Sequence, residues 1–141
     1  MPLSRQNQDT LLIALHELIE EAAEHTVRSL ANPSSLDLAY PPNGGLTSSE
    51  QEAVRELTVT PHLQHALRKV VADACCTVVF SFLNYVDGTA DPGRGKWSGI
   101  ALVDRKDSDH AEGMLHDEFF EKYWEWRKIR PRKVWRLDNL P

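Results

Sequence analysis

The feature that most constrains the fold is a long apolar stretch in the middle of the chain, residues 70–86, interrupted by Asp73, Ser81 and Asn84. The stretch is shorter than the ~20 apolar residues that span a bilayer, so we expect no membrane segment. A helix that is apolar on nearly every side needs neighbours on every side. The sequence therefore predicts that this segment lies at the centre of the fold, surrounded by other elements.

Periodicity and capping signals predict three helices in the first part of the chain. The first covers about residues 9–30, where the apolar residues Leu11, Leu15, Leu18 and Ala22 recur at helical spacing. The second follows the capping box at residues 47–50 and continues to about residue 57. The third begins with a Thr-Pro pair at residues 60–61 and extends toward residue 85. The β-branched residues between 74 and 83 leave a strand possible there.

A fourth helix is predicted after Asp109 and ends at Arg130-Pro131. Residues 97–103 have apolar side chains on both faces and predict a strand, which residues 134–137 could pair with. A short edge strand is also possible at residues 36–40. The predicted fold class is α+β, predominantly α: about four helices around a buried central helix, with a small two- or three-stranded sheet. We expect residues 1–141 to form a single domain.

Composition and cysteine usage predict an intracellular, cytoplasmic protein. With 41% hydrophobic and 26% charged residues, the composition is that of an ordinary globular chain. The N-terminal residues lack the basic-then-apolar order of a secretion signal. The only cysteines, Cys75 and Cys76, are adjacent in the apolar stretch, so they cannot link distant parts of a fold. We expect them to be reduced thiols in the core.

The charge is divided unevenly along the chain. Residues 1–121 hold 19 acidic and 9 basic side chains, whereas residues 122–141 hold 2 acidic and 7 basic ones. The basic end, interleaved with aromatic residues, is typical of nucleic-acid binding. However, the chain carries a net charge of −5, and cations also stabilise the C-terminal end of a helix. The sequence therefore argues against a nucleic-acid partner.

The sequence contains no recognisable catalytic motif. The loop at residues 87–96 holds Asp87, Asp91 and Arg94, but its glycines do not match a phosphate-binding loop, and turn formation explains its aspartates. The alternative hypothesis is a small-molecule or metal-dependent enzyme with a site near this loop and His62 and His65. We expect no metal ligands and no cofactor, and we favour a non-enzymatic protein.

The last predicted helix suggests a binding surface. A core face holds Leu115, Phe119, Tyr123 and Trp126, but Phe120 and Trp124 lie roughly 100–140° away from it. Either residues 131–137 or 97–103 cover these two rings, or the rings contact another chain. The predicted partner-binding residues are Phe120, Trp124, Arg127, Lys128 and Trp135. The predicted function is protein binding or self-association, one version being a small acidic protein of the neutralising or immunity type that binds a basic partner.

Overall fold

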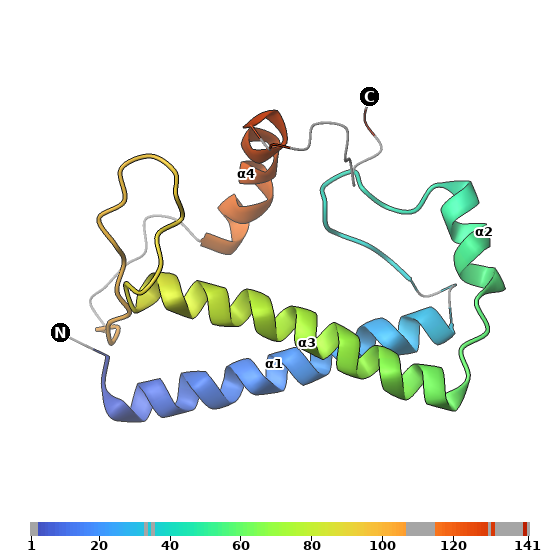
Figure 1. Cartoon of the computed structure of the whole chain (residues 1–141), viewed down its shortest axis with the longest axis horizontal. Coiled ribbons are helices and arrows are strands. Elements are labelled where there is room, and N and C mark those ends of the chain that lie inside the picture. Colours follow the sequence, from blue (N-terminus) through green and yellow to red (C-terminus); the bar gives the residue numbers. More distant parts are fainter. Residues whose placement is uncertain are drawn as a thin grey trace. The chain divides into compact units, whose positions relative to one another are not determined.

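A computed structural model describes residues 3–32, 34, 36–106, 115–129, 131 and 140. These residues contain four helices (Figure 1). They are α1 (Arg5–Ala31), α2 (Ser48–Glu56), α3 (Pro61–Val86) and α4 (Leu115–Ile129). The chain divides into two compact units, which are described separately. The first comprises Met1–Ala31 and Val59–Asp107, and the second comprises Asn32–Thr58 and Ser108–Pro141.

The first unit is built on α1 and α3, which run antiparallel and pack against each other (Figure 1). The buried apolar residues of this pair are Ile19, Ala23 and Val27, all on α1, and Val27 is 0% exposed. After α3 the chain returns in irregular structure. There, the carboxylate of Asp104 accepts hydrogen bonds from the Ser4 amide (3.1 Å) and the Asn7 side chain (2.7 Å). These bonds attach residue 104 to the start of α1.

The second unit contains α2 and α4. The predicted capping box is confirmed at the start of α2: the Thr47 hydroxyl accepts the Glu50 amide (3.3 Å) and the Glu50 carboxylate accepts the Thr47 amide (2.8 Å). Around α4, Tyr123 is only 4% exposed, and its ring lies 5.6 Å from that of Tyr40 in an edge-on arrangement. Tyr40, which is itself 47% exposed, thus packs against the buried Tyr123.

The predicted α+β class is wrong, because the described residues are helical or irregular and contain no strand. Residues 97–103 are irregular, and the positive φ of Gly99 (89°) interrupts the extended backbone that a strand needs. Residues 36–40 likewise form no strand, and the alternative strand at 74–83 is part of α3. The expected pairing segment, residues 134–137, lies outside the described residues.

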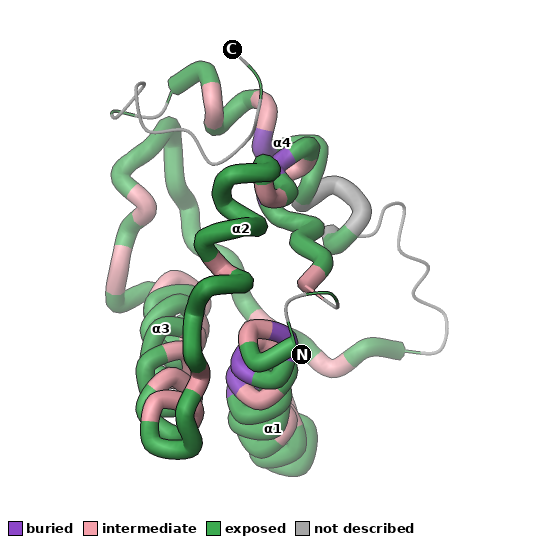
Figure 2. The backbone as a smooth tube through the Cα atoms, turned by 90° about the vertical axis from the view of Figure 1, so that its right-hand side faces the viewer, coloured by how far each residue is buried: buried purple, intermediate pink, exposed green. Residues whose placement is uncertain are grey.

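The prediction of a buried central helix is also wrong. α3 has the expected bounds, from a Thr60 cap and an initial proline, but none of its residues is buried (Figure 2). Within its unit α3 packs against the helix α1, and the irregular residues that follow contact its C-terminal end, where the Tyr85 and Trp97 rings lie 6.4 Å apart. These neighbours leave much of the helix surface exposed. The cysteines follow the same pattern: they are free thiols, with Cys75 half-buried and Cys76 exposed, so they are not the core thiols that the sequence predicts.

The structure does not test the prediction of a single domain, since the division into two compact units does not establish whether either folds alone. Among the described helices, none combines the length and apolar character needed to cross a membrane.

Candidate protein-binding site

The loop after α3 gives its acidic residues structural roles. Asp87 caps the C-terminus of α3, and its amide donates to the Leu83 carbonyl (2.8 Å). The carboxylate of Asp91 accepts the Gly93 amide (2.6 Å), the bond of an aspartate turn. Arg94 is exposed beside two glycines with positive φ. This arrangement is that of a tight turn, and a ligand site formed by Asp87, Asp91 and Arg94 stays a prediction.

The two histidines of the alternative enzyme hypothesis, His62 and His65, lie on the first turns of α3 and are both exposed. They are at the opposite end of this helix from Asp87, because the helix runs from Pro61 to Val86. Among the described residues, no group of three or more histidine, cysteine, aspartate or glutamate side chains could hold a metal ion. His62 and His65 and the loop at residues 87–96 therefore lie at opposite ends of α3.

The predicted binding residues of α4 have different surroundings. Phe120 is exposed, its ring 6.5 Å from that of Tyr40, while Trp124 is half-buried, its ring 5.3 Å from that of Tyr123. Arg127 donates a hydrogen bond to the Leu140 carbonyl (3.0 Å), and Lys128 is exposed. Trp135, the fifth predicted residue, lies outside the described residues.

The sequence analysis gives two explanations for Phe120 and Trp124: coverage by residues 131–137 or 97–103, or contact with another chain. Neither of them includes Tyr40. This tyrosine contacts Phe120 and Tyr123, although the sequence placed it in a possible edge strand. Of the four described members of the predicted set, Phe120 and Lys128 are exposed, whereas Trp124 and Arg127 are half-buried. The role of α4 in binding a partner stays a prediction.

The largest departure from ordinary burial is on the α1–α3 pair. Several large apolar side chains of α3 are exposed, with Val78 at 69% and Phe80 at 65% of their full accessibility. On α1, Leu18 is 59% exposed. Single exposed apolar residues are common on protein surfaces, but a run of them on adjacent helices is typical of an interaction site.

Three of the exposed residues, Leu18, Val78 and Phe82, lie by helical periodicity on one surface, which we call the apolar face, whereas Phe80 lies about 160° around α3 from Val78 and is outside it. This face is defined by Leu11, Leu15, Leu18 and Ala22 of α1 and Leu67, Val71, Ala74, Val78 and Phe82 of α3. The α1 members are the stripe that the sequence analysis identified. However, α1 buries a neighbouring stripe instead, through Ile19, Ala23 and Val27. The signal for this stripe was therefore present in the sequence as evidence for a helix, but it did not indicate what covers the stripe.

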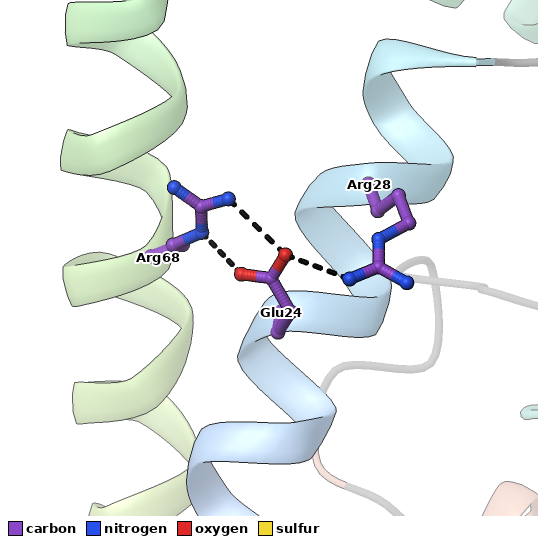
Figure 3. Close-up of polar contacts among 3 residues, drawn as sticks. All are labelled: Glu24, Arg28 and Arg68. Atoms are coloured by element: carbon purple, nitrogen blue, oxygen red, sulfur yellow. Dashed lines mark hydrogen bonds and ion pairs between the residues drawn. The ribbon is translucent and has the colours of Figure 1, made fainter.

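A charged contact joins α1 and α3 on another side (Figure 3). The Glu24 carboxylate accepts hydrogen bonds from Nε and Nη2 of Arg68 on α3, the latter at 3.1 Å, and from Nη2 of Arg28 on α1 at 3.1 Å. Hydrogen bonding by Arg68, followed by that of Arg28, lowers the pKa of Glu24 below its usual value of 4.5. This fork-like contact links the two helices through both oxygens of one carboxylate, the geometry of a strong charge-assisted hydrogen bond.

Comparison with known proteins gives no functional guide. No protein-family model matches the chain, and no curated protein or solved structure shows significant similarity to it. The interpretation of the site therefore depends on its own geometry and chemistry.

Proposed function

We propose that this protein is a non-enzymatic protein-binding module that contacts its partner through the apolar face of the α1–α3 pair. One observation carries the proposal: the most apolar helix of the chain has no buried residue. Leaving such surface in water is unfavourable by roughly 25 cal/mol for each Å² of apolar area. Covering Val78, Phe82 and Leu18 with another polypeptide would recover this free energy.

The distribution of charge on the two helices supports this proposal. At about 100° per residue, each Asp, Glu, Lys and Arg of α1 and α3 lies about 80° or more from the centre of the apolar stripe on its own helix. The fully buried centres of protein–protein interfaces are depleted in charged residues in the same way. The apolar face thus has the composition of an interface centre, with charged residues at its edges.

We also propose a cytoplasmic location for the protein, on the basis of the cysteines. Its two cysteines are free, and the chain exposes Cys76. Exposed thiols of this kind persist in a reducing compartment.

Site-specific photo-crosslinking in cells tests the proposed function. We expect a benzophenone amino acid in place of Val78 to form adducts with another polypeptide. The matched control carries the same group in place of Asp73, which is also exposed on α3 but lies about 140° around the helix. Adducts from position 78 and few from position 73 support the proposal. Equal adducts from both positions, or none from either, contradict it.

A further inference from the structure

The apolar face has two properties that identify its partner. We propose that a second copy of this chain covers it, so that two α1–α3 pairs form a four-helix assembly. This inference rests on the proposed function, because it names the partner of the same face. It predicts a symmetric contact in which each copy contributes the same residues.

The first property is that each helix carries two apolar stripes: one packs in the pair, and the pair covers the other only in part. In this second stripe Leu11, Leu15, Leu67 and Val71 are half-buried, and the other members of the apolar face are exposed. On α1 the buried stripe contains Ile19, Ala23 and Val27, and the stripe of the apolar face lies about 105° around the helix from it. On α3 the half-buried residues Ala72 and Val79 belong to a stripe at a similar angle, about 105°, from that of the apolar face. A helix in a four-helix bundle contacts two neighbours, so it needs two such stripes at roughly a right angle.

The antiparallel arrangement brings the two stripes of the apolar face together. On both helices the stripe of the apolar face is rotated around the helix axis from the stripe packed in the pair. The rotation has the same direction in both, opposite to the direction in which the chain winds. Two antiparallel helices are related by a two-fold axis perpendicular to the plane that contains both helix axes. Rotation about this axis moves a stripe from one helix to the other but keeps it on the same side of the plane. Equal displacements therefore place the α1 and α3 stripes on one side of the pair, where they form a continuous surface.

The second property is the position of the acidic residues. α1 carries Glu17, Glu20, Glu21 and Glu24, and the chain has a net charge of −5. Two copies would repel each other if these side chains met across the contact. All four lie about 90° or more from the centre of the α1 stripe. A basic partner would be attracted by acidic side chains at the contact, and the apolar face has none. The uncharged face therefore fits a second copy of this acidic chain better than a basic protein.

The available area is sufficient for a stable dimer. A helix of 26 residues is about 39 Å long, and two helices side by side are about 20 Å wide. This whole side of the pair is therefore on the order of 800 Å², about the area that each partner contributes to a standard interface. The apolar face occupies about 24 Å of its length, from Leu67 to Phe82 of α3, and the charged residues at its edges supply the rest.

The test is the mass of the purified full-length chain in solution, measured by light scattering, for the wild type and two variants. We expect twice the 16.0 kDa of one chain for the wild type and half that mass for Val78→Glu. The matched control is Thr77→Glu, which adds the same charge one residue away. Thr77 is exposed and points about 100° from Val78, so this variant keeps the mass of the dimer.

Leu18→Glu, which changes the face from the other helix, should also halve the mass, with circular dichroism confirming that the helices persist. If either variant unfolds, a benzophenone at position 78 of the purified chain decides, since its adduct must have the mass of two chains. A wild-type mass of one chain overturns the inference, as does a dimer that both glutamates leave intact. A monomeric wild type that forms adducts with a different protein in cells overturns the inference but leaves the proposed function standing.

Discussion

At the scale of single residues, Glu24 has the most distinctive surroundings of the carboxylates in the α1–α3 pair. It receives hydrogen bonds from arginines on both helices, although it is partly exposed (Figure 3). Exposed ion pairs usually contribute little to stability, but this carboxylate binds the Arg68 guanidinium with both oxygens. We therefore expect it to define the alignment of the helices and to make stability sensitive to acid.

The lowered pKa of Glu24 predicts a specific dependence on pH. Because the folded pKa lies below 4.5, the stabilising contribution is fully present above pH 4.5 and is lost as the pH falls through the folded value. Urea unfolding of the wild type and Glu24→Gln should show a difference in free energy that is constant near neutral pH and shrinks below pH 4.5. Glu21→Gln controls for the loss of one negative charge from the same helix. A wild-type advantage over Glu24→Gln that does not change with pH would refute this assignment.

At the scale of secondary-structure elements, the local signals predicted the helices well. The Thr47 capping box and the Thr60-Pro61 start are both observed, because they depend on hydrogen bonds within a single turn. The strand at 97–103 was wrong, because an apolar pattern does not reveal the positive φ of Gly99. On α1, both Leu11 to Ala22 and Ile19 to Val27 recur at helical spacings of three or four residues, so the pattern did not indicate which set packs in the pair. Periodicity identifies an apolar stripe but not the element that covers it.

The assignment of the stripe that packs in the α1–α3 pair predicts the effect of a valine truncation. Val27 is 0% exposed, so Val27→Ala removes two buried methyl groups and should cost roughly 2 kcal/mol of unfolding free energy. Val70→Ala makes the same change at a position that is 64% exposed and should cost much less. Urea unfolding of both variants at a low protein concentration provides the comparison. Equal losses for the two variants would mean that the buried stripe is wrongly assigned.

At the scale of the whole molecule, the sequence contained the candidate site but could not identify it. The stretch at 70–86 correctly indicated a helix, but the expectation that other elements of the chain surround it was wrong. The number of neighbours that one chain supplies is a tertiary property, and no pattern along the sequence encodes it directly. Tyr40 illustrates the same limit, because its contacts with Phe120 and Tyr123 join segments that are distant in the sequence.

The central claim is that the middle of α3 is covered by another polypeptide, since its neighbours within the first unit leave it exposed. Amide hydrogen exchange of residues 74–83, measured by mass spectrometry over a series of protein concentrations, tests this claim most directly. Exchange reports local opening, which is frequent where few apolar contacts are buried. We expect rapid exchange in dilute protein and progressively slower exchange as the concentration rises and the second copy binds. Slow exchange that is the same at every dilution would show that the chain covers α3 by itself, and would contradict the account.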